Sequence, residues 1–257
     1  MEILLICLVA FSVSILTFFS GFGLGTILTP FLAIYFPIDL AIALTGVVHF
    51  FNNIFKIILV GKKAHWPTFL KFGIPAILCA FLGAQVLHHI DENQILFSYK
   101  MMGNNYDVTT LKFVISLLLI VFALMDLIPK VKNLNFHKKY LPLGGALSGF
   151  FGGLSGHQGA LRSAFLIKAG LDKSAYIGTA VAVSTLVDFT RISVYSQRFI
   201  ENGLGDNLTL VICASASAII GAFIGLKLLK KVTLDFIQTL VAFLLIGISI
   251  ALGAGWM

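Results

Sequence analysis

The chain has 257 residues, of which 58% are apolar and only 11% are charged, with a mean hydropathy of +0.99. A soluble fold of this length cannot hide so much apolar surface, and most apolar stretches run for about the 20 residues that cross a bilayer. The composition therefore excludes a soluble protein and indicates a multi-pass protein of the cell membrane, plasma or inner.

The first half predicts an interrupted helix followed by three long helices. Residues 3–19 are apolar, begin after Glu2 and lack a small-residue cleavage site, so we expect a membrane helix and not a cleavable signal peptide. The run Gly21-Phe22-Gly23-Leu24-Gly25 then breaks the helix, and a short helical piece follows over 26–36. Hydropathy predicts long helices over 38–60, 67–90 and 109–128.

A basic linker, residues 130–139, divides the chain almost in half. After it, helical pieces are expected over 141–153 and 160–170, on either side of a second glycine break, and long helices over 174–196, 208–229 and 233–255. We therefore expect three parts: a first membrane repeat over 1–129, the linker, and a second membrane repeat over 140–257.

Matching residues support a duplication. Five residues of the first half find the same residue type 134 positions later, and they are Gly25, Phe31, Leu32, Ala41 and Thr45. Gly83-Ala84 likewise recurs as Gly221-Ala222. The halves therefore read as two repeats of one helical unit.

Loop charges predict the orientation, because Lys and Arg gather at cytoplasmic ends. Lys62, Lys63, the linker and the lysines near 230 mark the cytoplasmic side, whereas the loops around Asp39, Asp91 and Glu201 are relatively acidic. Helix 38–60 then runs inward and helix 174–196 outward. The expected fold is an all-α polytopic membrane protein with two inverted repeats, each a glycine-broken helical hairpin plus three transmembrane helices. This topology mostly explains the net charge of +7, and nothing beyond charge indicates nucleic-acid binding.

The two glycine breaks are the strongest indication of function. Irregular backbone at membrane depth must be buried in protein or line a wet cavity. A helix that begins after each break directs free N–H groups and a partial positive charge at that cavity. Matched broken helices in two halves of a membrane protein indicate a transporter site near the bilayer midplane. Close helix packing through glycine is the alternative reading of each break.

Polar side chains inside the apolar helices extend this prediction. Helix 38–60 places five polar residues on one broad face: Thr45, His49, Asn52, Asn53 and Lys56. Lys56 is expected to snorkel toward the cytoplasm. A charge at the bilayer centre costs at least about 2.5–3.5 kcal/mol, so the charged groups of helix 174–196 should face the bundle interior. There, Asp188 and Arg191 could form a structural ion pair or take part in coupling.

Arg162 lies in the first turn after the second break, where an arginine can hold an oxyanion with two parallel hydrogen bonds. It could instead neutralise Asp188 from a neighbouring helix. His157 and Gln158, on the break itself, could donate to a substrate or cap the following helix. The expected substrate-binding residues are Gly23, Gly25, Thr45, His49, Asn53, His157, Gln158, Gly159, Arg162 and Thr179.

These features resemble the TauE/SafE-type permeases, which include sulfite and organosulfonate transporters. The resemblance covers nearly the whole chain and rests on the two glycine breaks, each followed by a short helix. An Ala-x-x-x-Thr pattern, Ala41 to Thr45 and Ala175 to Thr179, adds to it. The second half departs from the family pattern, because His157 and Gln158 interrupt the glycines and Ala164 stands where proline is common.

The resemblance implies a secondary permease and not an enzyme. The expected substrate is a small oxyanion, sulfur-containing, such as sulfite, thiosulfate or an organosulfonate, bound at the midplane and moved by alternating access. Its partners would be this anion and the lipid bilayer, and no cofactor or metal is expected.

Two other functions stay open at this point. Gly153-Leu154-Ser155-Gly156 resembles the G-x-S-G element of rhomboid-type intramembrane proteases, in which a histidine such as His49 would activate Ser155. A metal or cation transporter could use His49, His157 and Asp188, although their spacing is not that of a metal site. Cys7, Cys79 and Cys213 stand singly in separate apolar segments and read as packing residues.

Overall fold

The computed structural model describes residues 2–18, 23–91, 94–128, 136–201, 207–228 and 234–256. Its first-half helices are α1 (Glu2–Thr17), α2 (Leu24–Leu32), α3 (Ile38–Val60), η1 (Gly61–Lys63), α4 (Trp66–His89) and α5 (Thr110–Leu127). Its second-half helices are η2 (Lys138–Tyr140), α7 (Leu141–Ser155), α8 (Gly159–Leu166), η3 (Ile167–Ala169), α9 (Lys173–Glu201), α10 (Leu208–Leu228) and α11 (Leu234–Gly253). The helices expected from hydropathy are all present, with ends that differ by a few residues.

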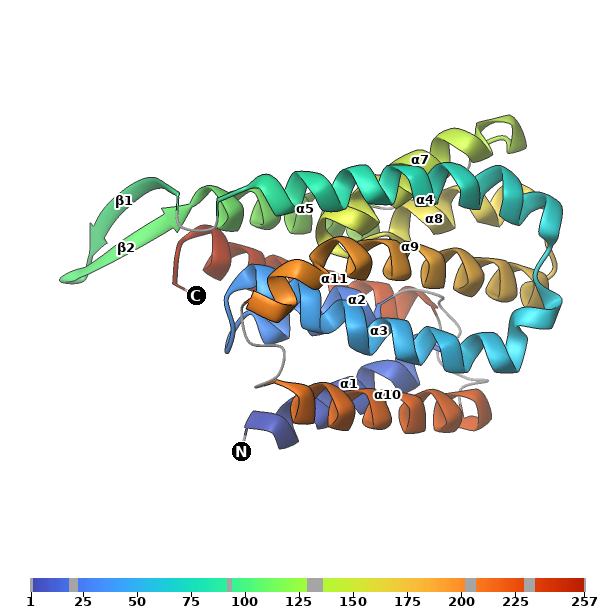
Figure 1. Cartoon of the computed structure of the whole chain (residues 1–257), viewed down its shortest axis with the longest axis horizontal. Helices are drawn as coiled ribbons and strands as arrows, with labels where there is room; N and C mark the ends of the chain where they lie inside the picture. The colour runs from blue at the N-terminus through green and yellow to red at the C-terminus, as the bar shows by residue number, and fades with distance from the viewer. Residues whose placement is uncertain are drawn as a thin grey trace.

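A β-hairpin is the element that the sequence analysis missed. Strands β1 (Ile95–Met101) and β2 (Asn104–Thr109) pair antiparallel where only an acidic loop was expected, and they project from one end of the helical bundle (Figure 1). Met102 and Gly103 form the turn with positive φ angles of 50° and 87°. Two-residue hairpin turns of this kind usually have the sequence Asn-Gly or Asp-Gly, and the Met-Gly sequence found here does not predict one.

The hairpin is attached to the C-terminal end of the chain. The Tyr99 hydroxyl donates to the Ala254 carbonyl at 2.6 Å and accepts from the Trp256 indole N–H at 3.0 Å. The hairpin and both ends of the chain therefore lie at one end of the bundle, and the α3–α4 connection lies at the other (Figure 1).

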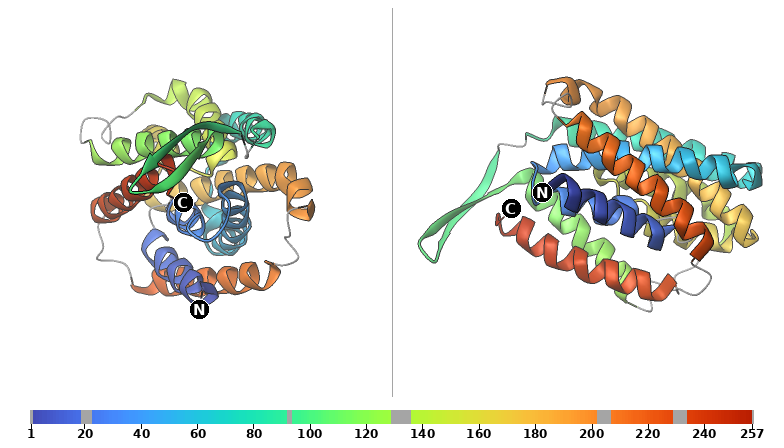
Figure 2. Two further views of the ribbon diagram at one scale, coloured as in Figure 1. Left: turned by 90° about the vertical axis from the view of Figure 1, so that its left-hand side faces the viewer. Right: turned by 90° about the horizontal axis from the view of Figure 1, so that it is seen from below.

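Glycines bring helices of opposite halves into backbone contact. α7 runs beside α4 in the same direction, and a Cβ atom on Gly145, Gly149 or Gly153 would collide in turn with the carbonyl oxygens of Phe72, Ala76 and Ala80. α1 runs beside α10 in the same manner, with Gly221 and Gly225 against the Phe11 and Ile15 carbonyls (Figure 2). Small residues at this spacing permit such close approach of membrane helices.

The centre of the bundle is formed by α3 and α9, which run antiparallel. Gly178, near the start of α9, lies against Val60 at the end of α3, and Gly46, near the start of α3, lies against Arg191. Asp172 caps α9: its carboxylate accepts from the N–H groups of Ala175 and Ser174, and these bonds hold its pKa below the usual range.

The same helix pairs are in contact when each helix is replaced by its equivalent in the other half, which means α1 by α7, α3 by α9, α4 by α10 and α5 by α11. The pair α1–α10 then becomes the pair α7–α4, and the pairs α3–α9 and α5–α11 are unchanged. Because the equivalent helices α3 and α9 run in opposite directions, this is the packing that two inverted repeats would produce. The repeat boundaries at residues 129 and 140 stay a prediction.

The outer surface is suited to lipid. Among the described residues, four helices are long and apolar enough to cross a membrane: Ile38–Lys63, Trp66–His89, Lys173–Ser196 and Leu208–Lys227. The outward face of α4 exposes Leu70, Ile74, Leu78, Phe81, Leu82 and Val86. A continuous apolar stripe of this kind is unfavourable in water and is the normal surface of a protein in a bilayer.

We expect the hairpin end to face outward and the lysine-rich α3–α4 connection to face the cytoplasm. Single cysteines on a background without Cys7, Cys79 and Cys213 test this. Met102→Cys at the hairpin tip, where the side chain is 94% exposed, should react with an impermeant thiol reagent on intact cells. The exposed Lys63→Cys should react only after the membrane is opened, and labelling of Lys63→Cys in intact cells would reverse the topology.

Candidate functional site

The two glycine breaks meet at one small buried cavity between α2, α3 and α8. It is lined by Gly23, Gly25, Thr26, His49, Gly156, Gln158, Gly159 and Arg162. Gly23 and Gly25 belong to the first break and Thr26 directly follows it, whereas Gly156, Gln158 and Gly159 belong to the second break and Arg162 lies one turn beyond it. The cavity has a volume of about 10 Å³, which is the space of a single water molecule. The convergence of the two breaks expected from the sequence is therefore present.

Two helix N-termini point at this cavity without a side-chain cap. α2 begins after Gly23 and α8 begins after Gln158, and neither residue caps its helix with a side-chain hydrogen bond. The first helical bonds are donated by Ile27 to the Gly23 carbonyl and by Arg162 to the Gln158 carbonyl, each at 3.0 Å. The N–H groups that precede them in the first turns have no acceptor within their helices. Gly23 has φ 117°, a conformation that glycine adopts readily and other residues rarely do.

The two breaks also touch each other directly. A Cβ atom on Gly25 would lie 3.6 Å from the Gly156 carbonyl oxygen and 3.8 Å from the His49 ring. His157 bridges the breaks, because Nδ1 lies 2.9 Å from the Ser155 carbonyl oxygen and Nε2 lies 3.4 Å from that of Thr26. This side chain therefore holds the breaks together beside the cavity and is not among the residues that line it.

A fully buried carboxylate joins the two central helices. Asp188 of α9 contacts His49 Nδ1 at 2.7 Å and accepts from Asn53 Nδ2 at 2.9 Å, both from α3. Arg191 completes the network: its Nε donates to the other carboxylate oxygen at 3.1 Å and its Nη2 lies 3.0 Å from it. The i,i+3 ion pair that the sequence suggested is therefore present, and it is tied to the cavity through His49.

The Arg191 guanidinium fills the space between two glycines. A Cβ atom on Gly156, which has φ 79°, would lie 2.6 Å from Arg191 Nη1, and one on Gly46 would lie 3.3 Å from the guanidinium carbon. A positive group therefore sits directly behind the second break. It adds to the field of the two helix ends at the cavity.

Comparison with protein families gives an independent result. The model of the family described as Sulfite exporter TauE/SafE matches residues 6–252. The chain belongs to the TauE/SafE family. Comparison with curated proteins and with solved structures gave no match. TauE/SafE proteins are membrane transporters of sulfite and related sulfur anions, so the resemblance drawn from the sequence is confirmed.

Gln158 is tied to the neighbouring helices of this TauE/SafE protein. Its carbonyl oxygen accepts from the Ser148 hydroxyl, and its side-chain Nε2 donates to the Ser184 hydroxyl, both at 3.1 Å. The side-chain Oε1 is buried without a hydrogen bond. The break is therefore anchored to α7 and α9 on either side.

Three residues lie elsewhere than the sequence analysis expected. Thr179 is at the α3–α4 connection, where its hydroxyl accepts from the His65 N–H at 2.9 Å. Thr45 is buried one turn before His49, and its hydroxyl has no hydrogen bond. The expectation that Lys56 snorkels is wrong, because its side chain is only 4% exposed. Conversely, Thr26 and Gly156 line the cavity but were not among the expected substrate-binding residues. Each is next in sequence to one that was, since Thr26 follows Gly25 and Gly156 precedes His157.

The Ser155 side-chain hydroxyl is not paired with a histidine among the described residues. Its hydroxyl donates to the Phe151 carbonyl within α7 at 3.1 Å, while His49 contacts Asp188 and Asn53. In the same part of the chain, no group of three His, Cys, Asp or Glu side chains could hold a metal ion.

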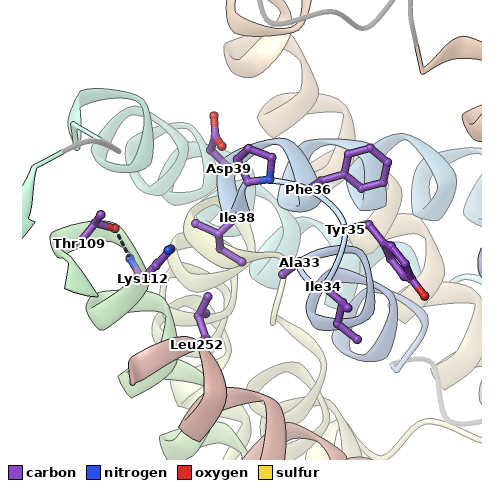
Figure 3. A pocket seen from close by; sticks show the side chains of 10 residues that line it. Ala33, Ile34, Tyr35, Phe36, Ile38, Asp39, Thr109, Lys112 and Leu252 are labelled. Carbon is purple, nitrogen blue, oxygen red and sulfur yellow. Dashed lines mark hydrogen bonds between the residues drawn. The ribbon is translucent and has the colours of Figure 1, made fainter. Parts of the chain in front are cut away.

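A larger pocket of about 450 Å³ opens where α2 turns into α3. It is lined by residues 33–39 together with Thr109, Lys112 and Leu252, and it lies at the end of α2 remote from the cavity (Figure 3). Its lining includes a carboxylate, Asp39, and an ammonium group, Lys112, and among the described residues no glycine break at a helix N-terminus lines it. The small cavity is therefore the better candidate for an anion site in a TauE/SafE transporter.

Gly25→Ala tests whether the cavity is the transport site. The added methyl group meets only ordinary contacts, so the protein should fold, but it fills the space of the single water. We expect transport of sulfite into proteoliposomes to fall at least tenfold, with unchanged elution on size exclusion. The control is Gly247→Ala in α11, where a Cβ atom meets nothing within 4 Å. Normal transport by Gly25→Ala would place the site elsewhere.

Proposed function

We propose that this permease moves a small sulfur-containing oxyanion, such as sulfite, thiosulfate or an organosulfonate, through the cavity between α2 and α8. The observation on which this rests is the convergence of two uncapped helix N-termini on one buried space. Backbone N–H groups and the helix dipole favour an anion at such a place. Arg162, only 1% exposed and in the first turn of α8, adds a full positive charge and a donor geometry that matches oxyanions.

The size of the cavity supports a mechanism in which helices move. An oxyanion of four or more heavy atoms needs several times the volume of about 10 Å³ that the closed cavity has. α2 and α8, with nine and eight residues, are short, and each begins at a glycine-containing break. We infer that their displacement opens the cavity to one side and then to the other. Inverted repeats, here 1–129 and 140–257, supply two equivalent pathways for this alternating access.

The Asp188 network supports the site from behind. His49 lines the cavity and is held by Asp188, so its ring orientation is fixed toward the substrate space. The same carboxylate is neutralised by Arg191, so Asp188 does not repel an incoming anion as an isolated charge would. We assign the protein to the plasma or inner membrane on its topology and its family.

A ligand-stabilisation screen of the purified protein tests the substrate class. We expect sulfite, thiosulfate or a sulfonate at one hundred times its dissociation constant to stabilise the fold by about 2.7 kcal/mol, which raises the unfolding temperature. Chloride and simple carboxylates at equal ionic strength are the controls. Stabilisation by carboxylates alone would contradict the assignment of a sulfur oxyanion.

Arg162→Lys tests direct recognition by the arginine. The lysine keeps the charge but cannot donate two parallel hydrogen bonds, and loss of one bond to a charged group costs about 1.5–3 kcal/mol, or roughly ten- to a hundredfold in affinity. The matched control is Arg191→Lys, because Arg191 is equally buried but bonds to Asp188. That variant should lose thermal stability more than affinity. Full substrate affinity in Arg162→Lys would remove Arg162 from the site.

A double substitution separates the two roles considered for Arg162. If it served only to neutralise Asp188, Arg162→Leu combined with Asp188→Leu should recover the binding lost in the single variants. We expect no recovery, because Asp188 is already paired with Arg191 on its own helix and with His49 and Asn53 of α3.

A further inference from the structure

His49 brings into the cavity a side chain that can change its charge near neutral pH. It is 6% exposed, and it lines the cavity together with residues of both glycine breaks. Its ring edge faces the first break, since a Cβ atom on Gly25 would lie 3.8 Å from the ring Cγ and 3.9 Å from Cδ2. The ring therefore borders the substrate space, while its Nδ1 contacts Asp188.

The Asp188 carboxylate determines which ring nitrogen carries the proton. Its Oδ2 lies 2.7 Å from His49 Nδ1, a distance at which a lone pair on nitrogen and a carboxylate oxygen would repel each other. Nδ1 is therefore the donor, and a neutral ring has its lone pair on Nε2. Asn53 fits this assignment, because its Nδ2, 3.2 Å from His49 Nδ1, donates to the same carboxylate oxygen at 2.9 Å. Within the described part of the chain, Nε2 has no hydrogen bond, so it is the nitrogen left for a ligand.

A neutral His49 is an unsuitable partner for an oxyanion. The lone pair on Nε2 is an acceptor, and the oxygens of a fully ionised sulfonate are acceptors as well. A hydrogen bond between them requires one added proton, and the protonated Nε2 then donates a charge-assisted hydrogen bond to the anion. The proton and the anion therefore favour each other's binding at the cavity.

The Asp188 network makes the added charge depend on the anion. Asp188 and Arg191 form an ion pair without net charge, so a proton on His49 adds one positive charge to a buried network. A buried charge without a counter-charge is costly. An anion in the adjoining cavity supplies the counter-charge, which couples the two binding events.

Three further ionisable side chains lie around the ring: Arg162 of α8 lines the same cavity, His157 lies on the second break, and Lys56 is two turns further along α3. The part of α2 that lines the cavity carries none. His157 is not suited to the role of His49, because both of its ring nitrogens face backbone carbonyl oxygens and its side chain does not line the cavity.

We propose that His49 is the proton-carrying residue of the transport site, which takes up one proton with each oxyanion that it binds, so that the permease cotransports the two. The inference rests on the proposed function and names the coupling ion of that site. The proton comes from the water on the side to which the cavity is open and forms the N–H bond at Nε2. It leaves with the anion when the cavity opens to the other side.

Titration calorimetry of the purified protein measures this proton. Methanesulfonate and thiosulfate are suitable probes, because both stay fully ionised between about pH 5 and pH 8, where histidine changes its charge. Sulfite is unsuitable, because it takes up a proton itself in this range. Binding heats in buffers of different ionisation enthalpy should show the uptake of up to about one proton per anion, and the affinity should fall by up to about tenfold for each unit of rising pH.

His49→Gln replaces the ring by an amide that can donate to an anion but cannot titrate. This variant should bind the probes without proton uptake and with an affinity that does not change with pH. The matched control is His89→Gln, which removes an exposed histidine at the end of α4 and should behave as wild type. In proteoliposomes held at zero membrane potential, wild type should accumulate methanesulfonate in an alkaline interior, and His49→Gln should only equilibrate it.

Binding of the probes to wild type without proton uptake would overturn the proposal and leave the anion permease standing. Proton uptake that persists in His49→Gln would overturn it too. Should His49→Gln fail to fold or to bind, His157→Gln decides: proton uptake that survives in this variant supports His49, and its loss there assigns the proton to His157. Binding of neither probe, nor of any other sulfur oxyanion, would refute the proposed function itself.

Discussion

A helix that begins inside an apolar bundle exposes N–H groups that lipid cannot satisfy, and the central architecture follows from this constraint. α2 and α8 both begin in this way, and most residues of both helices are buried. The glycines of the breaks let the two helix ends approach each other and let Arg191 fill the space behind them. An anion is the natural complement to the remaining donors.

The Asp188 network determines how rigidly this arrangement is held. It joins α3, whose His49 lines the cavity, to α9 through His49, Asn53 and Arg191. Removal of one partner from a buried ion pair costs about 3–5 kcal/mol, because an uncompensated charge is left behind. The same side chains that orient His49 are therefore also the principal polar attachment between the central helices, and substitutions there are expected to affect stability as well as binding.

The sequence was sufficient for the helices and for the position of the breaks, because hydropathy and glycine spacing are local signals. It also indicated the pairing of Asp188 with Arg191, since the i,i+3 spacing places them on one helix face. It could not locate Thr179, whose equivalence to Thr45 suggested a place in the site. Because α9 begins at the end of the bundle where α3 ends, Thr179 meets the α3–α4 connection. Lys56 was misjudged because Phe18, which lies over its ammonium group, is far away in the sequence and becomes a neighbour only in the folded chain, whereas Asn52 stands one turn earlier on α3 itself.

The backbone seams between α4 and α7 and between α1 and α10 restrict which parts can move. In each seam the glycines of one helix lie on the carbonyl groups of the other, so any side chain larger than hydrogen at these positions would force the two helices apart. Both seams unite a helix of the first half with one of the second. In the alternating access proposed above, a rigid body that contains one helix of a seam is therefore expected to contain its partner from the other half, so the moving parts would not coincide with the two halves of the chain.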